Sequence, residues 1–247
     1  MTANGNKFLL PEAPFKFLKI NDRQMVYEED FQRNRFQIVL VGDAEVGKST
    51  YLKRLKTNEF DPERTVTTAL DIVMLFVKLT ETKRRAKLAF YDVVGQDIKR
   101  IHSPQPLLTH SDAAVAFFDA TRPETFESLR MWKKRLDVDI ESAYYFVVVC
   151  NKIDLLADEG ELLIGKIEMW REQAKKMGAR QFILISAKDG TNCSQLCYEL
   201  ITAIFNERDQ LDKSDALTLT SSPRMLYRDM YVSHLPMPKK SRRCLML

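Results

Sequence analysis

The stretch that decides the fold is Phe36-Gln37-Ile38-Val39-Leu40-Val41-Gly42-Asp43-Ala44-Glu45-Val46-Gly47-Lys48-Ser49. It opens with apolar and β-branched residues, which predict a buried strand. The part bounded by glycines matches the pattern G-x-x-x-x-G-K-[ST], and a helical stretch, residues 50–56, follows it. A strand, a glycine-bounded loop and a helix in this order point backbone N–H groups and the helix dipole at a phosphate chain.

The loop therefore predicts a phosphate-binding site. Lys48 is expected to neutralise the outer phosphates, and the Ser49 hydroxyl is expected to coordinate Mg²⁺. The residues predicted to contact the nucleotide here are Gly42, Asp43, Ala44, Glu45, Val46, Gly47, Lys48, Ser49 and Thr50.

The rest of the chain alternates between strand-like and helical patterns. Strand-like runs occur at residues 72–79, 86–91, 113–118, 144–150 and 181–185, and helical patterns at 123–136, 161–177 and 194–207. This alternation predicts an α/β fold, a six-stranded and mainly parallel sheet with about five helices on both faces. Only a polar turn separates the runs 72–79 and 86–91, so we expect those two strands to pair antiparallel, which gives one antiparallel edge strand.

Composition and polarity divide the 247 residues into three parts. Residues 1–34 form an N-terminal extension, for which we expect one short element around Asp22 to Arg33. Residues 35–208 form the nucleotide-binding domain, and residues 209–247 form a polar tail that we expect to be mobile. The formal net charge of +4 is small, and four cysteines without a secretory signal favour a reduced, cytosolic setting over a disulfide framework.

Two further motifs follow predicted strands, where ligands bind in open α/β sheets. The first, Asn151-Lys152-Ile153-Asp154, resembles the base-reading N-K-x-D of small GTPases. The carboxylate of Asp154 can accept from both N1–H and the exocyclic amine of guanine, whereas adenine would leave this acid unpaired. The second, Ser186-Ala187-Lys188, resembles the S-A-K of the same family, whose backbone contacts the guanine oxygen.

Two further segments, residues 91–96 and 67–71, resemble the γ-phosphate-sensing segments of the Rab branch of the Ras superfamily. Tyr91-Asp92-Val93-Val94-Gly95-Gln96 is similar to its W-D-T-A-G-Q, and Thr67-Thr68-Ala69-Leu70-Asp71 is similar to its T-x-G-x-D. The resemblance implies the P-loop NTPase fold of a small GTPase over residues 34–208. It also implies phosphoryl transfer by positioning and charge stabilisation.

The same resemblance implies a role for each matched residue. Thr67 is expected to be the second protein ligand of Mg²⁺, and Asp92 is expected to hold the ion through water. Gly95 is expected to contact the γ-phosphate, and Gln96 is expected to orient the attacking water as the catalytic residue. Lys152 is expected to lie along the base, Asn151 to brace its loop, and Phe60 to pack on the guanine.

Several residues depart from the Rab pattern in ways that bear on hydrolysis. Ala44 and Glu45 stand in the phosphate loop, and Glu45 adds an acid that either faces solvent or weakens anion binding. Val94 replaces a small residue, and crowding there would displace the catalytic water. Because a misplacement of about 1 Å costs on the order of 100-fold in rate, we expect good nucleotide binding with slow unaided hydrolysis.

The C-terminus ends in Cys244-Leu245-Met246-Leu247, which fits the prenylation pattern C-a-a-X, and its terminal leucine favours a geranylgeranyl group. Lys239, Lys240, Arg242 and Arg243 precede it and would add the second signal that stable membrane residence requires.

The leading hypothesis is a Rab-like GTPase that uses Mg²⁺, cycles between its GTP and GDP forms and recruits effectors in membrane traffic. Its expected partners are guanine nucleotide, effector proteins, an exchange factor, a GTPase-activating protein and the cytosolic face of a membrane, and no nucleic acid. Two alternatives stay open: a GTP-bound scaffold that barely hydrolyses, and a Ras- or Rho-like signalling protein, which the single-cysteine end favours.

Overall fold

The computed structural model describes residues 14–18, 31, 33–62, 70–95, 108–156 and 160–218. The chain divides into two compact units, residues 1–205 and 206–247. The first unit contains the sheet and the motifs predicted to bind nucleotide, whereas the C-terminal prenylation pattern belongs to the second. The second is described only as far as residue 218, and its described residues belong to the last helix.

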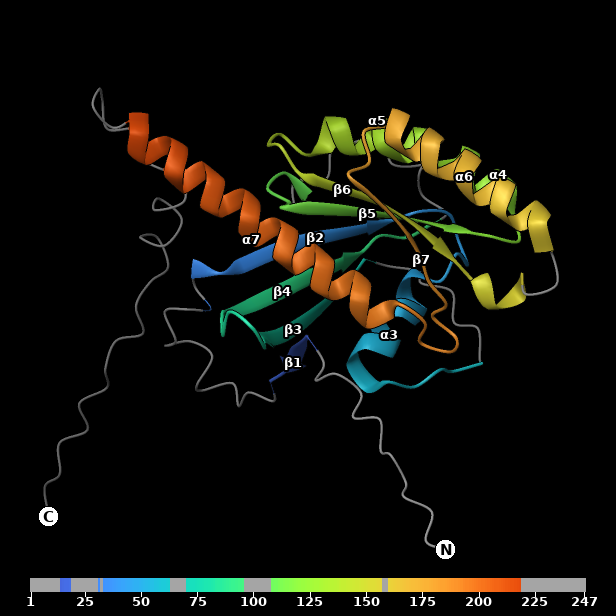
Figure 1. Ribbon diagram of the computed structural model, residues 1–247, viewed down its shortest axis with the longest axis horizontal. Coiled ribbons are helices and arrows are strands. Elements are labelled where there is room, and N and C mark those ends of the chain that lie inside the picture. The colour runs from blue at the N-terminus through green and yellow to red at the C-terminus, as the bar shows by residue number, and fades with distance from the viewer. Residues whose placement is uncertain are drawn as a thin grey trace, which may run out of the picture. The chain divides into compact units, whose positions relative to one another are not determined.

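A seven-stranded sheet forms the centre of the first unit, in the order β1-β3-β4-β2-β5-β6-β7 (Figure 1). Its strands are β1 (Phe15–Phe17), β2 (Arg35–Val41), β3 (Asp71–Leu79), β4 (Arg85–Asp92), β5 (Ala113–Asp119), β6 (Tyr145–Asn151) and β7 (Gln181–Leu184). The pairs from β4 through β2, β5 and β6 to β7 are parallel. β3 pairs antiparallel with β4, as its short connection predicted, and the α/β class is confirmed.

The sheet has one strand more than the six expected. β1 comes from the N-terminal extension and pairs antiparallel with β3, with Phe15 opposite Leu79 and Phe17 opposite Val77. β3, expected at the edge, is therefore an inner strand. Backbone hydrogen bonds from Leu18 N–H to the Phe76 carbonyl (2.8 Å) and from Thr80 N–H to the Pro14 carbonyl (2.9 Å) extend the pairing at both ends of β1.

Burial of a ring explains why this short strand is held in place. Phe15 is 5 % exposed and belongs to the main hydrophobic core, whereas Phe17 is 40 % exposed. Of the element expected around Asp22 to Arg33, only Phe31 and Arg33 lie within the described residues, and the buried Phe31 ring packs edge-on against Phe76.

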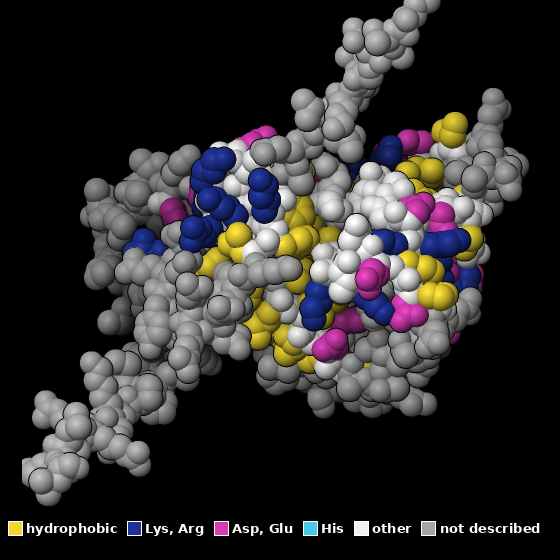
Figure 2. All heavy atoms as spheres, turned by 90° about the horizontal axis from the view of Figure 1, so that it is seen from below, with side chains coloured by type: hydrophobic (Ala, Val, Ile, Leu, Met, Phe, Trp, Pro, Cys, Tyr) yellow, Lys and Arg dark blue, Asp and Glu magenta, His cyan; other side chains and the backbone are white. Residues whose placement is uncertain are grey.

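Figure 2 shows the surface from below, where both hydrophobic side chains and a group of Lys and Arg side chains are visible.

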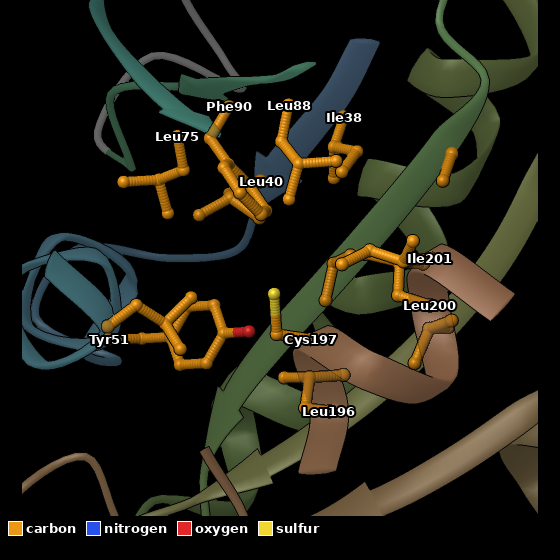
Figure 3. Packing of buried hydrophobic residues seen from close by; sticks show 14 of the residues in the cluster. Ile38, Leu40, Tyr51, Leu75, Leu88, Phe90, Leu196, Cys197, Leu200 and Ile201 are labelled. Carbon is orange, nitrogen blue, oxygen red and sulfur yellow. The ribbon is translucent and has the colours of Figure 1, made fainter. Parts of the chain in front are cut away.

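Helices cover both faces of the sheet (Figure 1). They are α3 (Lys48–Thr57), α4 (Pro123–Glu127), α5 (Leu129–Asp139), α6 (Gly160–Lys176) and α7 (Cys193–Thr218), with a short 3-10 turn, η2 (Ile153–Leu155). Side chains of α3 and α7 pack with one face of the sheet, as Figure 3 shows for Tyr51, Cys197 and Ile201. The apolar residues of α4, α5 and α6 belong to the core on the other face.

The alternating burial of β2 shows why its sequence is apolar at almost every position. Phe36, Ile38 and Leu40 enter one core, while Val39 and Val41 enter the other. A strand that is covered on both faces has no polar side, so its sequence reads as a continuous apolar run. This central position also places the end of β2, where the glycine-bounded loop begins, between its two neighbours β4 and β5.

Two helix boundaries differ from the expected ones. The helix expected at residues 123–136 is divided at Ser128 into α4 and α5. α7 continues to Thr218, beyond the expected end at residue 207 and into the segment expected to be a polar tail. In the described part of the chain, no helix is long and apolar enough to cross a membrane.

Candidate guanine-nucleotide site

The phosphate loop connects the end of β2 to the start of α3 and needs glycine at both ends. Gly42 has φ +134° and Gly47 has φ +97°, conformations that other residues rarely adopt. A Cβ at Gly42 would lie 2.2 Å from the Phe117 carbonyl oxygen of the neighbouring β5. The loop can therefore pass this close to the sheet only with glycine at that position.

Lys48 lies inside the loop rather than in solvent. It is 6 % exposed, and its Nζ donates to the carbonyl oxygens of Gly42 (2.7 Å) and Asp43 (3.0 Å). Burial lowers the pKa of Lys48 from 10.5 to about 8, although the carboxylates of Asp92 and Asp43 act in the opposite direction. A partly desolvated ammonium at the start of a helix is well placed to receive an anion.

Ser49 and Asp92 form the second polar pair of the site. The Ser49 hydroxyl donates to Asp92 Oδ2 at 2.5 Å, and Asp92 is only 1 % exposed. Burial raises the pKa of Asp92, which the hydrogen bond from Ser49 and the charge of Lys48 oppose. Within the described residues, Asp92 Oδ1 has no hydrogen-bond partner. A buried carboxylate with an unsatisfied oxygen beside a hydroxyl is a set of hard oxygen ligands that fits Mg²⁺.

Asn151, at the end of β6, joins the phosphate loop to the base-reading loops. Its Nδ2 donates to the Val46 carbonyl (2.7 Å), and its Oδ1 accepts from the Ala187 N–H (3.1 Å). A Cβ at Gly47 would lie 2.2 Å from Asn151 Nδ2, so the second glycine of the loop makes room for this amide. One side chain that is 1 % exposed thus connects three motifs that are distant in sequence.

The acid expected to read guanine, Asp154, is held from the opposite loop. The Ser186 hydroxyl donates to its Oδ1 at 2.8 Å, and Lys188 Nζ lies 3.6 Å from its Oδ2. The side chain of Asp154 is 12 % exposed, whereas that of Lys188 is 58 % exposed. Asp154 therefore has a fixed orientation while part of its carboxylate stays accessible to a ligand.

Lys152 adopts φ +66° and directs its Nζ to Asp119 Oδ2 at 2.7 Å. Asp119, which the sequence reading did not single out, is 1 % exposed. Burial acts to raise the pKa of Asp119, but hydrogen bonds from Lys152 and Thr121 outweigh it, and the pKa is lowered. The signal that could have identified Asp119 as a site residue is its position directly after the predicted strand at residues 113–118.

Two more residues reach the phosphate loop without having been predicted to do so. Arg122 Nη2 donates to the Ala44 carbonyl at 3.0 Å. Trp132 is 1 % exposed and donates from Nε1 to Asp43 Oδ1 at 3.0 Å. Nothing local in the sequence indicates these contacts, which join residues far apart along the chain.

The remaining predicted residues are distributed as follows. Gly95 lies against the loop, because a Cβ there would be 2.4 Å from the Ala44 nitrogen. Thr50 lies in the first turn of α3, Glu45 faces solvent with φ +64°, and Phe60 is 40 % exposed after α3. Thr67, Gln96 and Cys244 lie outside the described residues.

Comparison with known proteins decides the family. The sequence model of the Ras family matches residues 37–206. The chain belongs to this family. Ras-related protein RABA5b of Arabidopsis thaliana is 30 % identical over 171 residues, covering 69 % of this chain and 75 % of that protein. Human Ras-related protein Rab-9A is 27 % identical over 197 residues, covering 76 % and 94 %. Ras-related protein RabC of Dictyostelium discoideum is 27 % identical over 162 residues, covering 65 % and 79 %.

The expected family is therefore confirmed: the chain is a Rab-like small GTPase of the Ras superfamily. Proteins of this family bind guanine nucleotide and typically Mg²⁺. The loop around Lys48, the Ser49–Asp92 pair and the loops around Asp154 are the parts of the structure on which that activity would depend.

Proposed function

We propose that the protein binds GTP and GDP with Mg²⁺ in the site around Lys48 and Asp154, and that it hydrolyses GTP slowly. The observation that carries this proposal is the double hydrogen bonding of Asn151 to Val46 and Ala187. These bonds join the phosphate loop to the loop of Ser186, whose hydroxyl holds the Asp154 carboxylate, and this connection supports a shared site for phosphates and base. A phosphate-binding protein without base selection would not need Asp154 to be oriented by Ser186.

The chemistry assigned to each group follows from its surroundings. Lys48 and the N–H groups at the start of α3 would hold the phosphates, since Lys48 lies in the first turn of this helix with its ammonium in the glycine-bounded loop. Ser49 and Asp92 would hold Mg²⁺, which neutralises charge on the phosphate oxygens. Thr67 as a further ligand and Gln96 as the water-orienting residue are proposed from the family resemblance.

Nucleotide selection is tested by calorimetry on the full chain with GDP and with ADP. Wild type should bind GDP and should prefer it strongly to ADP. Asp154→Asn replaces an acceptor by an amide that can also donate, so it should weaken GDP binding and favour xanthosine diphosphate, which carries a carbonyl in place of the exocyclic amine. Asp137→Asn, on the exposed side of α5, is the matched control and should bind as wild type does. A preference for ADP would refute the proposal.

Slow hydrolysis is proposed from Val94, which is 8 % exposed and lies immediately before Gly95. A Cβ at Gly95 would lie 2.4 Å from the backbone of Asp43 and Ala44, so space here is small, and a branched side chain at the preceding position would leave little freedom for the attacking water. Val94→Ala should raise the single-turnover rate of GTP cleavage by about tenfold. Wild-type cleavage at the rate of a fast small GTPase would contradict slow hydrolysis.

The same observation favours a second candidate function, a GTP-bound scaffold. If hydrolysis is negligible, the protein should retain GTP through purification, which chromatography of the released nucleotide measures. Recovery of GDP alone would favour the cycling enzyme.

Recruitment of effectors in membrane traffic is proposed from the likeness to Rab proteins. The proposed membrane anchor is a prenyl group on Cys244, aided by the basic residues before it. Cys244→Ser should move the protein from the membrane to the soluble fraction of cells, and persistent membrane residence would count against this anchor.

A further inference from the structure

Asp119 lies at the end of β5, and its two carboxylate oxygens serve different purposes. Oδ1 accepts from the N–H (2.9 Å) and the hydroxyl (2.7 Å) of Thr121, which fixes the side chain close to its own backbone. Oδ2 accepts from Arg122 Nε at 3.0 Å and from Lys152 Nζ at 2.7 Å. One oxygen of a carboxylate whose side chain is 2 % exposed therefore holds two cations.

The two cations are connected to different loops of the proposed nucleotide site. Besides contacting Asp119, Arg122 donates from Nη2 to the Ala44 carbonyl at 3.0 Å, so its guanidinium spans the gap to the phosphate loop. Lys152 belongs to the loop that contains Asp154. The planar guanidinium of arginine can serve two acceptors at once in a fixed geometry, which the single ammonium of lysine does much less well.

We propose that Asp119 is a positioning residue for nucleotide binding, which fixes the phosphate loop through Arg122 and the guanine-reading loop through Lys152. This inference rests on the proposed guanine-nucleotide site. Loops that are held in place before the ligand arrives lose less conformational freedom on binding, so the bound nucleotide is retained longer. Asp119 itself does not need to touch the nucleotide.

A simpler role would be purely structural, with Asp119 stabilising the turn after β5. The Asp119 N–H does donate to the Thr125 hydroxyl at 3.0 Å, but that contact uses the backbone and survives replacement of the carboxylate. A structural role lowers the melting temperature without changing how the protein holds GDP. The two roles therefore differ in the dissociation rate of GDP and in the preference for the guanine base.

The test measures release of fluorescent mant-GDP from the full chain, and the affinities for GDP and for inosine diphosphate (IDP). IDP lacks only the exocyclic amine that Asp154 is proposed to accept from. Asp119→Asn should raise GDP dissociation by about tenfold, because both charged hydrogen bonds are lost together. It should also reduce the preference for GDP over IDP, since Lys152 is released.

Variants of Arg122 test the connection to the phosphate loop separately from the connection between Asp119 and Lys152. Arg122→Gln should raise GDP dissociation by about threefold and leave the preference over IDP unchanged, because Lys152 keeps its partner. Arg122→Lys should resemble Arg122→Gln, since one ammonium cannot hold both acceptors. Arg130→Gln, which loses an exposed ion pair with Glu127 and a hydrogen bond to Gln173, is the control and should match wild type.

Non-additivity tests whether Arg122 acts through Asp119. The double variant of Asp119→Asn with Arg122→Gln should release GDP within about twofold of Asp119→Asn alone. Wild-type GDP dissociation in Asp119→Asn, even with a lowered melting temperature, would overturn the inference, as would full additivity in the double variant. If Asp119→Asn does not fold, unchanged dissociation in Arg122→Gln overturns it instead. Absence of GDP binding by the wild type would refute the proposed function itself.

Discussion

Replacing Phe15 by alanine should lower the free energy of unfolding by about 3 kcal/mol. Phe15 is 5 % exposed, and its ring belongs to the core that also contains Leu79 of β3. Removing a buried phenylalanine ring costs about 3 to 5 kcal/mol, and the lower end applies because an edge strand can partly close the cavity. Urea denaturation of the full chain measures the change.

Phe17→Ala is the matched control for this prediction. It removes the same ring from the same strand, but Phe17 is 40 % exposed and contacts Phe15 edge-on with ring centroids 5.0 Å apart. A loss of about 1 kcal/mol is expected. GDP dissociation should not change in either variant, because β1 pairs with the end of β3 farthest from Asp92. A Phe15→Ala protein as stable as wild type would show that β1 is not part of the folded sheet.

Three further perturbations test single residues of the site and core. Tyr51→Phe should raise the free energy of unfolding by about 1 kcal/mol, because the buried Tyr51 hydroxyl has no hydrogen-bond partner within the described residues. This hydroxyl faces Cys197 in Figure 3. A loss of stability in urea would show that the hydroxyl has a partner. Glu45→Gly should stabilise the protein by about 0.5 to 1 kcal/mol, because it removes a side chain at φ +64°. A loss of stability in urea would contradict this reasoning. The pKa of Lys48, about 8 in the protein without nucleotide, should rise when phosphates bind, so GDP binding at pH 8 should take up about half a proton. Calorimetry in buffers of different ionisation enthalpy measures this proton uptake. A binding enthalpy that does not depend on the buffer would exclude it.

The lowered pKa of Lys48 also determines how the stability of the protein and its affinity for GDP change with pH. Its pKa in the folded protein lies below the unfolded value of 10.5, so the folded state without nucleotide binds fewer protons than the unfolded chain between about pH 8 and 10.5. Stability of that form should therefore increase with pH across this window. Affinity for GDP should decrease over the same window, because the phosphates require the charged ammonium.

The features predicted from sequence are those that local pattern determines. These features are the apolar run of β2, the glycines at positions 42 and 47, and the polar motifs at strand ends. Each of them is determined by residues close to it in the sequence. Hydrophobic periodicity and turn chemistry are sufficient there, and the order of elements then leaves few topologies for a parallel sheet. The α/β fold and the positions of most strands followed from these signals.

The features that were missed depend on partners far away along the chain. β1 is three residues long and carries no strand signal of its own, and it exists because Phe15 finds a place in the core beside β3. Arg122 reaches Ala44 across 78 positions, and Lys152 reaches Asp119 across 33. From sequence alone, a charged residue after a strand is predicted to be exposed to solvent. A carboxylate is buried only where cations compensate for the lost water, and the sequence does not identify those cations. The sequence alone thus determined the α/β class and the places of the glycine-bounded and polar loops, whereas tertiary packing decided the position of β1 and which side chains hold those loops together.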